Sequence, residues 1–194
     1  IDIHENIIVT GDTRFDRVVA IAEKFTPIQE VEKFCGTAKI VVAGSTWPED
    51  EEELDHYANA HPGIKFIIAP HEIYEEHLKD IEKLFQHTIR FSVLQKITAG
   101  AHDDDMDMHA GFANVLIIDN IGMLAKLYRY ADITYVGGGF GGDGVHNVLE
   151  AAVYGKPVLF GPVYEKYIEA AELVEIGGGI SINSALELEE VLND

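Results

Sequence analysis

Short runs of valine and isoleucine recur along the chain, and stretches with helical spacing of apolar residues lie between them. The apolar runs span residues 7–9, 39–43, 65–69, 115–118, 133–136 and 158–160. The helical stretches span residues 15–25, 49–60, 74–85, 123–130, 148–154 and 165–174. Uninterrupted apolar runs of this length are typical of strands buried on both faces. The alternation predicts an α/β fold, a doubly wound parallel sheet with helices on both faces.

The charge of the chain limits the partners that it can have. With 34 acidic against 14 basic side chains, the formal net charge is -20, which disfavours binding to nucleic acid or to an anionic membrane surface. An anionic ligand would have to be held locally by backbone amides and helix termini. Cys35 is the single cysteine and has no partner for an intrachain disulfide. No apolar stretch approaches the roughly 20 residues of a membrane span, and we expect a soluble chain.

The length of 194 residues suits a single domain. The chain starts at Ile1 without a methionine and enters an apolar run almost at once. We therefore expect a domain that belongs to a longer protein.

Ligands of open parallel sheets bind outside the carboxyl ends of the strands. Five segments rich in glycine or small polar residues are predicted at that edge, namely 44–46, 70–72, 119–122, 137–144 and 161–162. A ligand site is therefore expected where these loops meet.

Residues 137–144, which we name the glycine turn, contain six glycines in eight positions. Glycine permits close approach of the backbone, and the predicted helix behind the turn offers unpaired N–H groups, so a phosphate could bind there without a lysine. Asn147 could donate to a ligand and Glu150 could accept from sugar hydroxyls. The alternative is that the glycines serve only tight packing and that Glu150 is an ordinary acid near a helix start. The spacing fits neither a Walker motif nor a dinucleotide fingerprint.

Two further helix starts are ambiguous. Asp119 and Asn120 precede Gly122. This helix start could either donate backbone amides to a ligand or simply be capped by Asp119 or Asn120. Thr46 and Glu49 have capping-box spacing, which makes Thr46 a predicted cap and leaves Ser45 as the freer hydroxyl. The acidic residues 49–55 are predicted to form a solvated helix face.

A long irregular stretch is predicted for residues 95–114. It contains the acidic segment Asp103 to His109, in which carboxylates and imidazoles could bind a divalent cation. A solvated loop without a metal is the simpler interpretation. No serine or cysteine nucleophile accompanies the histidines, so hydrolase chemistry is not supported.

The motifs of this chain, in their order, resemble the C-terminal half of the lipid A 3-deoxy-D-manno-octulosonic acid (Kdo) transferases, inverting glycosyltransferases of the GT-B type. The matching segments are residues 11–18, 43–47, 69–71, 119–132, 136–139, 146–150 and 155–162. The pairing of His-Asn-x-Leu-Glu at 146–150 with Gly-Lys-Pro-Val at 155–158 is the most specific of them.

The resemblance implies a Rossmann-like fold in which residues 1–194 form the donor-binding domain for CMP-Kdo, with no cofactor and no metal. The full enzyme would transfer Kdo to a lipid A precursor at the cytoplasmic face of the inner membrane. The acceptor domain, with its membrane-associating segment and its acidic general base, has no counterpart in these residues. We therefore expect this domain alone to bind the donor without turnover.

The resemblance also implies a set of donor-binding residues: Ser45, Pro70, His71, Gly122, Met123, Leu124, Gly138, Gly139, His146, Asn147 and Glu150. Many members of the family have Pro-Arg-His where this chain has Pro70-His71-Glu72, so a basic contact is missing or supplied elsewhere. Two alternatives remain open. One is another GT-B glycosyltransferase or a UDP-sugar epimerase, and the other is a non-catalytic or metal-binding module built on Asp103 to His109.

Overall fold

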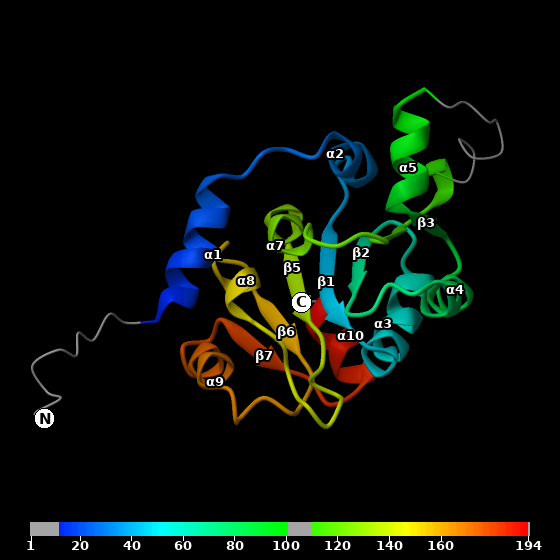
Figure 1. Ribbon diagram of the computed structural model, residues 1–194. Coiled ribbons are helices and arrows are strands. Elements are labelled where there is room, and N and C mark those ends of the chain that lie inside the picture. The colour runs from blue at the N-terminus through cyan, green and yellow to red at the C-terminus, as the bar shows by residue number, and fades with distance from the viewer. Residues whose placement is uncertain (1–11, 101–109, 194) are drawn as a thin grey trace, which may run out of the picture.

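A computed structural model describes residues 12–100 and 110–193 of the chain. At its centre lies a sheet of seven strands, with helices around it (Figure 1). The strand order is β3-β4-β2-β1-β5-β6-β7, and neighbouring strands are parallel throughout. The strands are β1 (Ile40–Thr46), β2 (Lys65–Pro70), β3 (Thr88–Arg90), β4 (Val115–Ile117), β5 (Ile133–Val136), β6 (Val158–Phe160) and β7 (Gly179–Ser181). Five predicted apolar runs are therefore confirmed as strands, whereas the run at 7–9 lies outside the described residues.

Helices connect the strands. They are α1 (Thr13–Glu23), α2 (Gln29–Cys35), α3 (Pro48–Ala60), α4 (Glu75–Leu84), α5 (Phe91–Thr98), α7 (Leu124–Leu127) with the 3-10 turn η2 (Tyr128–Tyr130), α8 (Leu149–Ala152), α9 (Ile168–Glu175) and α10 (Ala185–Asn193). The predicted irregular stretch is wrong at its start, because α5 continues to Thr98. Among the described residues, no helix has the length and apolar character that crossing a bilayer requires.

The sheet separates two apolar cores. Val42 and Ile67 point into a core shared with α2, α5, α7, α8 and α9, whereas their neighbours Val41 and Phe66 point into a core shared with α3, α4 and α10. Helix α1 lies outside the first layer, against α7 and α8 (Figure 1). Because successive side chains of a strand face opposite sides, both faces need apolar residues, which explains the uninterrupted runs. The predicted doubly wound fold with helices on both faces is confirmed.

The strand order reverses at β1. The chain passes from β1 to β2 on one side and later returns to place β5 on the other side. Between the carboxyl ends of β1 and β5, the amide of Gly137 donates to the carbonyl of Gly44 at 2.9 Å. Such a reversal leaves a crevice that no crossover helix covers. The glycine turn starts at this crevice.

Backbone segments meet without side chains where β5 and β6 end. A Cβ atom added to Gly139 would lie 2.5 Å from the Gly161 nitrogen, and one added to Gly161 would lie 2.5 Å from the Gly139 carbonyl carbon. Neither position can carry a side chain unless the backbone moves.

Replacing Gly139 by alanine is therefore expected to lower the free energy of unfolding by about 2 kcal/mol, the usual scale of overpacking. Urea titration followed by circular dichroism measures this loss. Gly142→Ala is the matched control, because an added Cβ at Gly142 meets no heavy atom within 4 Å. Equal stability of the two variants would contradict the close approach of the two strand ends.

Candidate functional site

A buried carboxylate, that of Asp50 in the first turn of α3, holds the glycine turn in place. Its Oδ2 accepts hydrogen bonds from the backbone amides of Gly138 and Trp47, both at 2.9 Å, and its Oδ1 accepts from the Tyr135 hydroxyl at 2.7 Å. The side chain of Asp50 is inaccessible to solvent. Burial raises the pKa of Asp50, and the three donors oppose that rise.

The prediction of a solvated acidic face on residues 49–55 is wrong for two of its members, Asp50 and its neighbour Glu51. Glu51 is also buried, where it accepts from the Thr46 hydroxyl at 2.8 Å and pairs with Nε2 of His77 at 2.9 Å. Burial raises the pKa of Glu51. The predicted capping role of Thr46 is wrong as well, since Trp47 is the N-cap residue of α3 and the Thr46 hydroxyl is used by Glu51.

His77 connects this hydrogen-bond network to the loop that follows β2. Its Nδ1 bonds to the carbonyl oxygen of Glu72 at 2.8 Å. A carbonyl oxygen only accepts, so Nδ1 bears the proton. The Glu51–His77 pair thereby fixes the backbone next to His71.

The glycine turn uses half of its eight backbone amides within the protein, those of Gly137, Gly138, Gly141 and Gly144, and His146 behind it uses its own as well. The amide of Gly138 donates to Asp50, that of Gly141 to the Gly138 carbonyl at 3.1 Å and that of His146 to the Gly137 carbonyl at 3.0 Å. The helix behind the turn, α8, has only four residues, so it contributes a small dipole. Tight packing thus accounts for much of the glycine content, and an anion at this place needs side-chain partners in addition to amides.

Three aromatic rings meet at the crevice, those of Trp47, His71 and His146, which we name the ring cluster. The centroid of His71 lies 4.6 Å from that of Trp47 and 4.5 Å from that of His146, in stacked geometry. The indole Nε1 of Trp47 donates to Nε2 of His146 at 2.8 Å. Burial and the nearby His71 lower the pKa of His146, so its ring is neutral at pH 7 with the proton on Nδ1.

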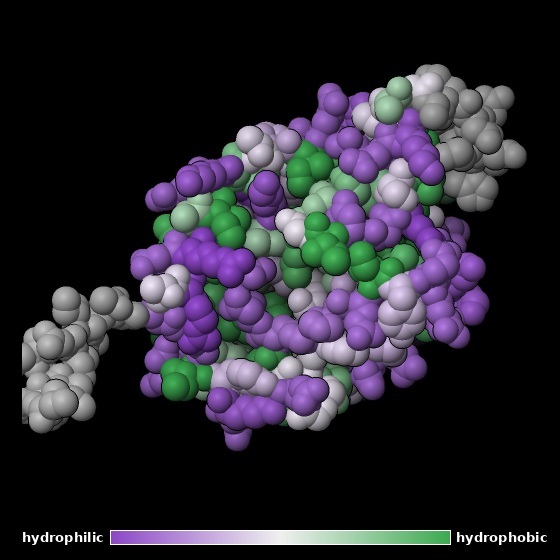
Figure 2. Space-filling model, in the orientation of Figure 1, coloured by the Kyte–Doolittle hydropathy of each residue, from purple (hydrophilic) through white to green (hydrophobic). Residues whose placement is uncertain are grey.

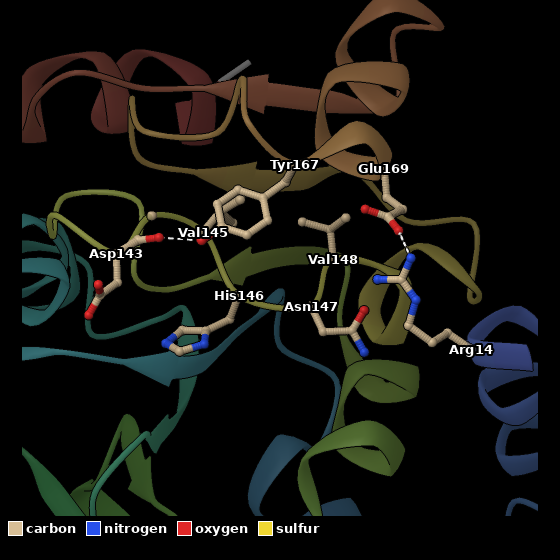
Figure 3. A pocket seen from close by; sticks show the side chains of 9 residues that line it. Arg14, Asp143, Val145, His146, Asn147, Val148, Tyr167 and Glu169 are labelled. Carbon is tan, nitrogen blue, oxygen red and sulfur yellow. Dashed lines mark hydrogen bonds and ion pairs between the residues drawn. The ribbon is translucent and has the colours of Figure 1, made fainter. Parts of the chain in front are cut away.

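A cleft of about 370 Å³, which we name the Arg14 cleft, opens on one side of the ring cluster (Figure 3). It lies among α1, the end of the glycine turn and α9, and its lining residues are Arg14, Asp143, Gly144, Val145, His146, Asn147, Val148, Tyr167 and Glu169. The side-chain Nδ2 of Asn147 donates to the Glu150 carboxylate at 3.3 Å, and its Oδ1 accepts from the backbone amide of Leu149 at 3.2 Å.

A second cleft of about 400 Å³, the His71 cleft, lies at the ends of β1, β2 and β4. Its lining includes Ser45, Pro70, His71, Gly122 and Leu124. His71 and His146 stack on each other while lining different clefts, so the ring cluster is the wall between them.

Seven of the eleven implied donor-binding residues line one of the two clefts, and the other four line neither. Gly138 and Gly139 are buried in backbone contacts, Met123 packs against one apolar core, and Glu150 sits behind Asn147. Sequence reasoning missed Arg14 and Trp47 as site residues, although both lie in segments that carry the family resemblance.

Two polar atoms near the His71 cleft have no hydrogen-bond partner in the described part of the chain, Oδ1 of Asn120 and the hydroxyl of Tyr128. A Cβ atom at Gly44 would lie 2.3 Å from the Tyr128 hydroxyl, so this glycine leaves room for the phenol. The next residue, Ser45, has a φ of 54°, an uncommon conformation for a residue with a side chain.

Hydrophilic residues cover most of the molecular face seen in Figure 2, in keeping with the acidic composition.

Within residues 12–100 and 110–193, no group of three or more histidine, cysteine, aspartate or glutamate side chains is arranged to hold a metal ion. The acidic segment Asp103 to His109 lies outside the described residues.

Removing the charge of Asp50 should loosen the glycine turn. Asp50→Asn replaces one acceptor oxygen by an NH₂ group that faces other donors, and we expect a loss of about 3 kcal/mol of unfolding free energy in urea titrations. The control is Glu49→Gln, an exposed neighbour on the same helix turn. A loss of less than about 1 kcal/mol for Asp50→Asn would show that the turn does not depend on this carboxylate.

The lowered pKa of His146 predicts how the stability of the fold depends on pH. Between that pKa and the ordinary value of 6.5, the native state binds fewer protons than the unfolded state, so stability falls as the solution is acidified. His146→Gln should reduce the dependence of the melting temperature on pH between 5 and about 6.5. The exposed His56→Gln is the control, and an unchanged slope in His146→Gln would refute the lowered pKa of this half-buried ring.

In sequence, the chain is 32% identical over 161 residues to a 3-deoxy-D-manno-octulosonic acid transferase of Chlamydia trachomatis, which covers 79% of this chain and 34% of the relative. It is also 32% identical over 159 residues to a bifunctional glycosyltransferase/methyltransferase of Fusobacterium nucleatum, covering 77% of this chain and 23% of that protein. The chain thus spans at most about a third of the length of these curated relatives. No family model matches it.

Among solved structures, the fold is similar to the C-terminal CMP-Kdo binding domain of WaaA from Acinetobacter baumannii. The TM-score is 0.62 at 18% identity, over 91% of this chain and 86% of that domain. This similarity supports the Rossmann-like fold. The chain is therefore related in sequence to the 3-deoxy-D-manno-octulosonic acid transferases, over about a third of the length of such a protein.

Proposed function

We propose that residues 1–194 form the donor-binding domain of a Kdo transferase and that the domain binds CMP-Kdo. The observation that carries the proposal is the pair of clefts at the strand-order reversal, which are lined by seven of the eleven residues that the family resemblance implies. The sequence relationship to curated Kdo transferases supports it. The similar solved domain from Acinetobacter baumannii is a CMP-Kdo binding domain, which points to the same ligand.

In this proposal, the two clefts divide the donor between them. Ser45, Gly122 and Leu124 border the His71 cleft, which would take the base, with Met123 beside it. Glu150, oriented by the Asn147 amide, would accept from a ribose hydroxyl. His146 and Asn147 would then face the phosphate in the Arg14 cleft. The ring cluster between the clefts would contact the connecting part of the nucleotide.

The chemistry asked of this chain is the stabilisation of a leaving group. When the acceptor hydroxyl attacks the anomeric carbon with inversion, the bond to the phosphate oxygen breaks and negative charge grows on CMP. Fixed donors near the phosphate favour that transition state. Such a step needs no metal. The general base and the acceptor site would come from the rest of the protein, so this domain alone would not turn over.

The wider proposal concerns the full-length protein. It would transfer Kdo to a lipid A precursor at the cytoplasmic face of the inner membrane, with membrane contacts made outside these residues. Transfer assayed with the complete protein tests this part, and the absence of turnover by residues 1–194 alone is the expected companion result.

Calorimetric titration with CMP tests the binding proposal. Glu150→Ala should weaken CMP binding about tenfold, because one hydrogen bond to a charged acceptor is lost. A CMP analogue that lacks both ribose hydroxyls should bind the wild type and Glu150→Ala equally. Glu172→Ala, an exposed acid on α9, is the matched control.

Unchanged CMP affinity of a folded Glu150→Ala variant would refute the ribose contact. Preference for UDP over CMP would favour another glycosyltransferase or a UDP-sugar epimerase. Tight binding of Ca²⁺ or Mn²⁺ that disappears on mutation of Asp104 and Asp105 would favour the metal-binding alternative.

A further inference from the structure

The Arg14 cleft has a deficit of groups that can balance an anion. Among the residues that line it, the backbone amides of Gly144, Val145 and His146 already donate to carbonyl groups of the protein, and the short α8 adds little dipole. The chain as a whole carries a formal charge of -20. A phosphate in this cleft would therefore need side-chain partners in addition to the remaining amides.

One side chain brings a positively charged donor to this cleft. Among the described residues that line the cleft, Arg14 is the single arginine or lysine. It comes from the first turn of α1, far in sequence from the glycine turn, and its side chain is 60% exposed. Figure 3 shows the guanidinium of Arg14 on the same side of the cleft as the Asn147 amide, with Glu169 facing it.

Arg14 is oriented by two acids. Its Nε donates to Oδ2 of Asp12 at 2.9 Å, and its Nη2 donates both to Asp12 and to Glu169 from α9. Its Nη1 donates to no acceptor within the described part of the chain. With Nε and Nη2 held by the two acids, the N–H groups of Nη1 remain as donors for a carboxylate or phosphate oxygen.

We propose that Arg14 binds an oxyanion of the donor in this cleft, with Asp12 and Glu169 as the residues that position it. This inference rests on the proposed function and adds to it a contact outside the implied donor-binding set. The shared chemistry is a phosphate or carboxylate oxygen. CMP offers only the phosphate, whereas CMP-Kdo also offers the carboxylate of the sugar acid.

Because exposed ion pairs contribute little to stability, Arg14 can be replaced without unfolding the domain. Calorimetry compares wild type, Arg14→Gln and Arg17→Gln, the last being an exposed arginine of the same helix that lies outside this cleft. We expect Arg14→Gln to bind CMP about tenfold more weakly, the scale of one charge-assisted hydrogen bond. Its affinity for cytidine, which has no phosphate, should equal that of wild type, and Arg17→Gln should behave as wild type.

The outcomes separate the inference from the proposed function. Weakening of CMP-Kdo binding alone would assign Arg14 to the sugar carboxylate, and weakening of both ligands to the phosphate. If wild type binds the ligands and Arg14→Gln binds them equally well, the inference is wrong while the proposed function stands. If wild type binds neither CMP nor CMP-Kdo, the proposed function fails and the inference fails with it.

Discussion

The buried carboxylate of Asp50 is the interaction on which the rest of the site depends. It accepts from Gly138, Trp47 and Tyr135 and so joins β5, the glycine turn and the start of α3 at the strand-order reversal. A carboxylate removed from water is costly unless donors surround it, and three donors do so here. With Asp50 fixed, Trp47 is held beside His146, and the wall between the two clefts follows from that placement.

This arrangement changes what the glycine turn can do. A turn whose amides were all free could bind an anion by itself. Here the Gly138 amide already donates to the Asp50 carboxylate, an anion of the protein itself. Under the proposed function, a bound anion would then be met mainly by side chains of the Arg14 cleft, including those of His146, Asn147 and Arg14. The glycines mainly permit the close packing that brings those elements together, as Gly139 and Gly161 do.

The fold class followed from the sequence because buried parallel strands leave long apolar runs, such as residues 65–69. The edge strands β3 and β7 were missed, because each has a single apolar residue, an isoleucine between two polar or small residues, and so forms no apolar run. The burial of Asp50 and Glu51 was mispredicted for a physical reason. Acids in the first turn of a helix are ordinarily solvated, and only tertiary contacts with His77 and Gly138 reveal their other role. The position of Arg14 in a cleft likewise depends on tertiary packing, which the periodicity of apolar residues does not predict.

The most direct test of a nucleotide site at this crevice is nuclear magnetic resonance of the ¹⁵N-labelled domain during titration with CMP. We expect amide shifts to gather at the ends of β1 and β4, at Ser45 and Gly122, and from His146 to Glu150. Small changes are expected on the opposite edge of the sheet, for example at Gly63. Shifts confined to residues far from the strand-order reversal, or no shifts at saturating CMP, would contradict a nucleotide site at this crevice.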